Sequence, residues 1–216
     1  MNKINYQKVL EQTIEEHQKK GEVPSLLLHS CCAPCSSYCL EYLSTYFEIT
    51  VFYYNPNIYP EEEYRTRVAE QQRFILSLPA KHPISFQEGA YDTERFYTMT
   101  KGLEDCPEGG ERCFRCYELR LREAAEAAKR YGMDYFTTTL SISPLKNAAK
   151  LNEIGASLEA EYGVRYLYSD FKKKNGYKRS VELSEQYYCG CVFSKNQRDR
   201  EIAAKEQAAS GMQTEE

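Results

Sequence analysis

The chain has 216 residues, 42% of them hydrophobic and 28% charged, which excludes intrinsic disorder and predicts one globular domain over 1–216. The 28 lysines and arginines against 32 aspartates and glutamates give a net charge of -4. This balance argues against a uniformly basic binder of nucleic acid or membranes, but it leaves room for a local basic face.

The N-terminal segment 1–21 carries acids and amides at helical spacing, with an amphipathic pattern over 5–20. It lacks the apolar stretch of a secretory signal, so we expect an N-terminal helix and a cytoplasmic protein. No segment approaches the roughly 18 apolar residues that span a bilayer, and we expect no membrane insertion.

Short apolar runs then alternate with helical patterns. Runs typical of strands occupy 25–30, 48–54, 83–91, 134–143 and 164–171, and helical patterns occupy 61–78, 113–132, 151–163 and a stretch from about residue 181. The alternation predicts an α/β fold, an open parallel sheet with flanking helices. We expect the tail 200–216 to fray at its end.

Four unusual loops follow predicted strands: CCAPC at 31–35, NPNIYP at 55–60, SISPLKN at 141–147 and SDFKKKNG at 169–176. In open parallel sheets, ligands bind in the crevice beyond the carboxyl ends of the strands. The sequence therefore predicts that these loops share one edge of the sheet and form the functional site.

Nine cysteines are unusual for a chain of this kind, and an odd number cannot form a complete disulfide framework. Cys31 and Cys32 are adjacent in a loop, and Cys113 and Cys116 are three apart on a helix, so each pair can offer two sulfurs to one metal centre. Zinc and an iron–sulfur cluster both fit four thiolates, and the spacing does not separate them. The alternative is that each group is buried packing or a lone thiol.

Cys189 and Cys191 are separated only by Gly190, which permits a tight bend. A disulfide between them is strained and therefore labile, which suits a redox role better than a structural one. The alternative is two free thiols. Of the other cysteines, Cys39 is expected in the core and Cys35 beside the centre, while Cys106 has no assignment.

The densest positive patch comprises Lys172, Lys173, Lys174, Lys178 and Arg179. Such a patch can grip a phosphate backbone, although a charge run is often only a solvated turn. His29, at the end of the first predicted strand, can serve as a proton donor or as a hydrogen-bonded structural residue.

The segments LLLHSCCAPCSSY, FYYNPNIYPEEEYRTR, PEGGERCFRCYELRL, TTTLSISPLKN, DFKKKNGYKRSVELS and YCGCVFS together resemble the epoxyqueuosine reductases of the QueH type, over about residues 25–194. The resemblance implies a fold like the nucleotide-hydrolase-like (HUP) α/β group. It implies a [4Fe-4S] cluster, a second iron, and reduction of the epoxide of epoxyqueuosine in tRNA, the last step of queuosine formation. Carried over by position, the cluster ligands are Cys31, Cys32, Cys113 and Cys116, and the redox-active disulfide joins Cys189 and Cys191.

Removal of an epoxide oxygen as water needs two electrons and two protons, so an external electron donor is expected as a partner beside tRNA. The loop after the fourth strand supplies the first candidates for substrate contacts, Ser141, Ser143, Lys146 and Asn147, and other loops supply Asn55, Asn57 and Lys173. Two alternatives from other classes are a non-catalytic zinc-binding RNA-interaction protein and a metal-free thiol–disulfide oxidoreductase.

Overall fold

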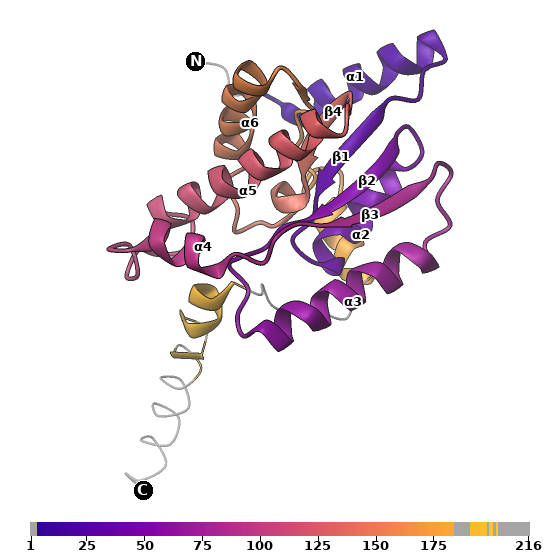
Figure 1. Cartoon of the computed structure of the whole chain (residues 1–216). Helices are drawn as coiled ribbons and strands as arrows, with labels where there is room; N and C mark the ends of the chain where they lie inside the picture. The colour runs from indigo at the N-terminus through magenta and orange to yellow at the C-terminus, as the bar shows by residue number, and fades with distance from the viewer. Residues whose placement is uncertain (1–3, 184–190, 198, 201, 203–216) are drawn as a thin grey trace, which may run out of the picture.

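Five parallel strands form one open sheet in the order β3-β2-β1-β4-β5, with helices on both faces (Figure 1). This computed structural model describes residues 4–183, 191–197, 199–200 and 202. The prediction of an open parallel α/β sheet with flanking helices is confirmed. In chain order the elements are α1 (Tyr6–Lys20), β1 (Ser25–His29), α2 (Ala33–Leu43), β2 (Glu48–Tyr53), α3 (Glu61–Ser77), β3 (Ile84–Glu88), α4 (Thr93–Thr100), α5 (Glu111–Arg130), β4 (Tyr135–Thr138), the 3-10 turn η1 (Thr139–Ile142), α6 (Ala148–Tyr162), β5 (Arg165–Tyr166) and α7 (Gly176–Glu182).

The central strand β1 separates two hydrophobic cores. Successive side chains of a strand point to opposite faces of the sheet. Leu27 joins a core with α5 and α6, whereas Leu26 and Leu28 join a second core with α1 and α2. Since both faces of β1 are buried, it forms a continuous apolar run rather than an alternating one.

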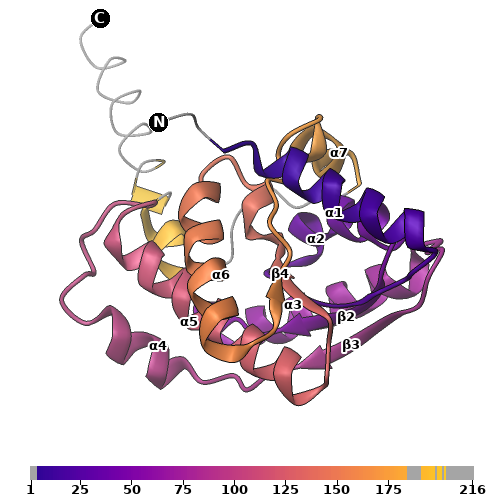
Figure 2. The same cartoon turned by 90° about the horizontal axis from the view of Figure 1, so that it is seen from above.

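Helix α5 is the longest helix in the described part of the chain, and it carries its apolar residues on one stripe. Leu121, Ala124 and Ala128 lie fully buried on that stripe, three or four residues apart, as a helix period requires. Figures 1 and 2 show α5 beside α6 on one side of the sheet. The first turns of α5 therefore lie at the carboxyl edge of the sheet, where the loops gather.

Local signals explain several helix boundaries. Helix α1 ends at Gly21, whose φ of 69° is the left-handed conformation that glycine adopts without strain. The side chain of Asn147 accepts a hydrogen bond from the backbone N–H of Lys150 and thereby caps the start of α6. At Gly176, a Cβ atom would lie 1.9 Å from the carbonyl oxygen of Phe171, so only glycine fits where α7 begins.

Three predicted strands are several residues shorter than expected, and the one predicted over 83–91 is limited to Ile84–Glu88. The strand predicted over 134–143 ends at Thr138, because its hydroxyl accepts a hydrogen bond from the N–H of Leu140 and turns the chain into η1. The strand predicted over 164–171 pairs only at Arg165–Tyr166, since the amide of Ser169 turns to bond with Asn152 instead.

Three helices also differ from the sequence analysis. Helix α7 begins at Gly176, before the predicted start near residue 181, and α2 and α4 were not predicted. Of the tail expected to fray, 200–216, only 200 and 202 are described. Among the described residues, no helix combines the length and apolar character needed to cross a membrane.

Candidate metal and redox centre

The CCAPC loop connects the carboxyl end of β1 to the first turn of α2. Extended backbone at Cys32 precedes the helix, and Pro34 occupies the first turn, where its missing N–H costs no hydrogen bond. The sulfur atoms of Cys31, Cys32 and Cys35 lie within 4.8 Å of one another, with 3.8 Å between those of Cys31 and Cys32. Three thiols therefore converge at a helix N-terminus, where the backbone favours negative charge.

A second pair of thiols comes from α5. Cys113 and Cys116 are three residues apart in its first turns and lie on the same side of the helix. The N–H of Gly109 donates to the sulfur of Cys113 over 3.2 Å. The structure gathers the four predicted ligands into one buried core, with Cys35 packed against it.

Arg120 joins the two halves of this centre. Its Nε donates to Nε2 of His29 over 3.2 Å, and its Nη2 donates to Oδ1 of Asn55. Arg120 is 4% exposed. Its charge acts on both Cys31 and Cys116. The centre therefore contains a buried positive charge close to a loop cysteine and a helix cysteine.

His29 is a structural residue in this arrangement. Its Nδ1 lies 2.8 Å from Oγ1 of Thr138, and its Nε2 lies 3.2 Å from Nε of Arg120 and 3.1 Å from the carbonyl oxygen of Tyr54. Burial and the neighbouring charge of Arg120 lower the pKa of His29 to about 3. The ring is therefore neutral at physiological pH, and the hydrogen-bonded alternative describes it.

The three loop thiols differ in how readily they ionise. Hydrogen bonds from Cys32 and Cys35 lower the pKa of Cys31 well below its usual range. The same interactions with Cys31, together with burial, hold the pKa of Cys35 well above it. Cys39 faces the other core, as expected, and burial raises the pKa of its thiol. The loop thus offers one readily ionised sulfur with two neutral neighbours.

The CxC motif is only partly described, because Cys189 lies outside the described residues. Cys191 forms an antiparallel bridge with Ile58, and the N–H of Val192 donates to the carbonyl oxygen of Asn57 over 3.2 Å. Cys191 also acts electrostatically on Cys116. The chain after the CxC motif therefore lies against the loop after β2, beside the helix cysteines.

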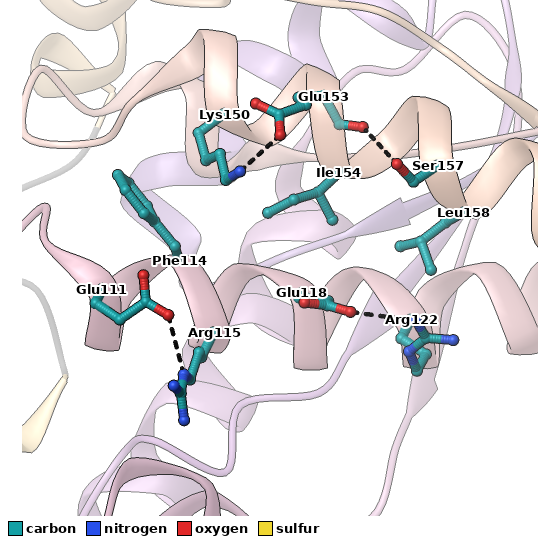
Figure 3. Close-up of a pocket in the computed structure, with 10 residues that line it drawn as sticks. All are labelled: Glu111, Phe114, Arg115, Glu118, Arg122, Lys150, Glu153, Ile154, Ser157 and Leu158. Atoms are coloured by element: carbon teal, nitrogen blue, oxygen red, sulfur yellow. Dashed lines mark hydrogen bonds and ion pairs between the residues drawn. The ribbon is translucent and has the colours of Figure 1, made fainter. Parts of the chain in front are cut away.

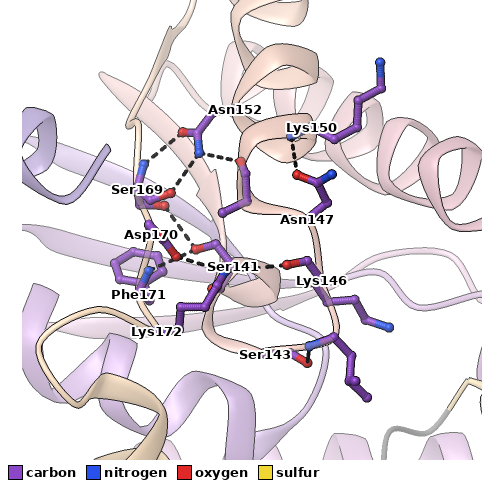
Figure 4. A network of polar contacts seen from close by, with 12 residues as sticks. Ser141, Ser143, Lys146, Asn147, Lys150, Asn152, Ser169, Asp170, Phe171 and Lys172 are labelled. Carbon is purple, nitrogen blue, oxygen red and sulfur yellow. Dashed lines mark hydrogen bonds and ion pairs between the residues drawn. The ribbon is translucent and has the colours of Figure 1, made fainter. Parts of the chain in front are cut away.

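Several predicted substrate residues hold the loops together instead of standing free. The amide of Phe171 donates to the hydroxyl of Ser141, which lies 3.4 Å from that of Ser169 (Figure 4). Asn147 caps α6, and the hydroxyl of Ser143 accepts from the N–H of Leu145. These contacts join the loop after β4 to the loop after β5. Whether the same side chains touch substrate stays a prediction.

The other predicted contacts differ in exposure. Lys146 is buried and pairs with Glu108 at 2.5 Å, whereas Lys173 is exposed. Asn55 is buried and donates to the carbonyl oxygen of Ser30 over 2.8 Å. Asn57 is also buried, and within the described chain its Oδ1 has no hydrogen-bond partner.

The basic patch is partly neutralised. Lys174 pairs with Glu11, and Arg179 pairs with Glu41 and Glu182. Lys172 donates to the carbonyl oxygen of Ser141 over 3.2 Å, so it supports the loop. Exposed positive charge remains at Lys173 and Lys178.

Two buried polar groups near the CCAPC loop bear on whether the site fits an iron–sulfur cluster. The hydroxyl of Tyr53 and the Nε2 of Gln71 have no hydrogen-bond partner within the described chain. Tyr53 lies close enough to Cys31 and Cys32 for their charges to raise the pKa of its hydroxyl, after burial as the main cause. Cluster sulfurs accept hydrogen bonds from such donors. The clustered thiols of Cys31, Cys32 and Cys35, with those of Cys113 and Cys116 in the same core, supply the donor chemistry of a thiolate-held cluster.

Sequence reasoning missed Thr139 and Gln71, and it did not predict that Arg120 would be buried. Thr139 places its hydroxyl 3.6 Å from the sulfur of Cys31, across 108 positions of the chain. Of these three residues, only Arg120 could have been placed near the cysteines from the sequence, since it lies one helical turn beyond Cys116. Cys106, which had no assignment, lines a cavity of about 360 Å³ with Arg112 and Phe193.

Such a centre defines a class of α/β protein whose chemistry is carried by cysteine sulfur, either bound to metal or cycling between thiol and disulfide. The family model described as Epoxyqueuosine reductase QueH matches residues 26–197. A relative of that name from Staphylococcus epidermidis is 45% identical over 202 residues, which cover 89% of this chain and 85% of the relative. Relatives of the same name come from Streptococcus pyogenes (44% identity; 89% of this chain, 78% of the relative) and Thermotoga maritima (36%; 84% and 97%).

The chain therefore belongs to the epoxyqueuosine reductase QueH family, as the motifs indicated, and it is an enzyme of the oxidoreductase class.

Proposed function

We propose that this enzyme reduces the epoxide of epoxyqueuosine in tRNA to give queuosine. Membership of the QueH family is the main support for this proposal, since the region that the family model matches contains both cysteine pairs. It is supported by the position of the thiols at the carboxyl edge of the sheet, where ligands of open parallel sheets bind. The reaction removes the epoxide oxygen as water and leaves a carbon–carbon double bond, at the cost of two electrons and two protons.

The cofactor in this proposal is a [4Fe-4S] cluster held by Cys31, Cys32, Cys113 and Cys116. When bound, the cluster supplies electrons one at a time, at a potential set by its surroundings. The protein contributes a buried pocket, the Arg120 guanidinium, and donors at Tyr53 and Gln71.

The CxC motif is proposed to take electrons from an external donor. Two thiols release two electrons and two protons when they form a disulfide, which matches the demand of the epoxide. In support, Cys191 lies near enough to Cys116 to influence its charge. This donor is a protein or small molecule able to reduce a strained disulfide.

Substrate contacts are proposed from three loops on the same edge of the sheet. Asn57 has a buried acceptor that no described residue bonds, so it can take a donor from the substrate. Lys173 can meet a phosphate. The remaining proposed contacts are Ser141, Ser143, Lys146, Asn147 and Asn55.

The first test is purification without oxygen, followed by a visible spectrum and analysis of iron, sulfide and zinc. Iron and sulfide in equal amounts, together with conversion of epoxyqueuosine in tRNA, are the expected results. Zinc alone without turnover would favour the non-catalytic RNA-interaction protein. Absence of metal together with disulfide exchange would favour the thiol–disulfide oxidoreductase.

A further inference from the structure

A single buried arginine reaches both halves of the cysteine centre. Arg120 follows Cys116 by four residues on α5, and residues so spaced lie on the same side of a helix. The Nε atom of Arg120 contacts His29, which lies two residues before Cys31 in the chain. The cation therefore comes from the helix that carries one cysteine pair and contacts the end of the strand that leads into the other pair.

The contacts of Arg120 hold it in this position. His29 at the end of β1 and Asn55 after β2 both accept hydrogen bonds from it, and all three side chains are at most 4% exposed. An arginine stays protonated in proteins because its pKa exceeds about 12. The structure thus contains a fixed positive charge that neither solvent nor pH can readily remove.

A cluster with four thiolate ligands is negatively charged, and each added electron makes it more so. A buried cation stabilises the reduced form more than the oxidised form, because charges interact more strongly in an interior than in water. The cation therefore raises the reduction potential of a cluster beside it.

We propose that Arg120 is a positioning residue that acts through its fixed charge to set the reduction potential of the bound cluster. This inference rests on the proposed function, because it requires the cluster to be present. In support, Arg120 lies one helical turn after Cys116 on α5, and its Nε lies 3.2 Å from Nε2 of His29, two residues before Cys31.

Arg122 supplies a matched control on the same helix. It lies two residues further along α5 and faces the groove between α5 and α6, where Glu118 and Glu161 pair with it (Figure 3). Its side chain is 31% exposed. Replacement of Arg122 removes one guanidinium from α5 without changing the charge beside the cysteines.

The test is a redox titration of the cluster, followed by its visible and electron paramagnetic resonance spectra, in wild type, Arg120→Gln, Arg120→Lys and Arg122→Gln. In Arg120→Gln we expect the reduction equilibrium constant to fall at least tenfold, which is about 59 mV toward negative potential for one electron. Arg120→Lys, which retains the charge, and Arg122→Gln should both stay close to the wild type. Iron content and thermal unfolding report whether each variant folds and loads.

The outcomes separate this inference from the proposed function. A wild type that binds no iron and sulfide overturns both together. A wild type that binds the cluster, with the same potential in Arg120→Gln, overturns the role of Arg120 alone. If Arg120→Gln loses the cluster, retention of the cluster at wild-type potential in Arg120→Lys supports the charge, whereas equal loss in both variants overturns it in favour of a purely geometric role.

Discussion

The hydroxyl of Ser30 donates a hydrogen bond to Oε1 of Gln71 over 2.8 Å, and both side chains are fully buried. The hydroxyl of Ser36 reaches the same oxygen over 2.9 Å. Because Ser30 and Ser36 flank the CCAPC loop, a single glutamine on α3 fixes the loop from the side of the second core. The position of Cys31 and Cys32 thus depends on a residue 40 positions or so further along the chain.

Gln71→Leu should therefore destabilise the protein by about 1–3 kcal/mol, because a buried hydroxyl loses its acceptor. Iron content should fall with it, since the loop would lose its anchor. Chemical denaturation of the metal-free protein measures the first effect, and iron analysis measures the second. Gln72→Leu, on the exposed side of α3, is the control and should stay within about 0.5 kcal/mol of the wild type. Equal stability of the two variants would refute an anchoring role.

The proposed ligand set predicts which cysteines the metal requires. Serine at Cys113 or Cys116 should remove most of the iron, because each replaces one thiolate of four. Cys39→Ala should retain iron, since this buried side chain belongs to the other core. Cys35→Ala should also retain iron under the proposed set. Loss of iron in Cys35→Ala would instead place Cys35 among the ligands. The test is sharp because the sulfur of Cys35 lies close to those of Cys31 and Cys32.

The double variant Cys189→Ser with Cys191→Ser tests the electron relay. Iron content should be unchanged, while turnover with a physiological donor should be lost, because serine cannot form or break a disulfide. Direct chemical reduction of the cluster should still be possible in this variant. Full turnover with the physiological donor would remove the CxC motif from the reaction.

Asp134 links the starts of β1 and β4, since its carboxylate accepts from both the N–H and the hydroxyl of Ser25. These hydrogen bonds hold the pKa of Asp134 below its usual range. A depressed carboxyl pKa stabilises the folded state above the unfolded pKa of about 3.9, and this stability is lost as pH falls through the folded value.

Asp134→Asn should therefore lower the free energy of unfolding at pH 7, and the difference from the wild type should vanish in acid. Because the side chain is 48% exposed, solvent screening limits the effect to about 1 kcal/mol or less. Denaturant titrations at several pH values between 7 and 3 measure it. A difference that persists unchanged at pH 3 would contradict the assignment.

Local patterns of the sequence determined the type of fold and the cysteine motifs. The apolar run at Leu26, Leu27 and Leu28 predicted a strand, and the helical pattern over 113–132 predicted most of α5. Both follow from the periods of strand and helix, which act over a few residues. The motif spacing likewise indicated the family, because it requires no knowledge of the tertiary contacts.

Only the tertiary structure decided how the cysteines are surrounded. Arg120 meets His29 across 91 positions, Thr139 meets Cys31 across 108, and Gln71 meets Ser30 across 41. No local period encodes such contacts, because they depend on how β1, β2 and α5 pack around the carboxyl edge of the sheet. Burial and charge at the centre are therefore properties of the assembled fold, whereas the positions of the cysteines along the chain are given by the sequence.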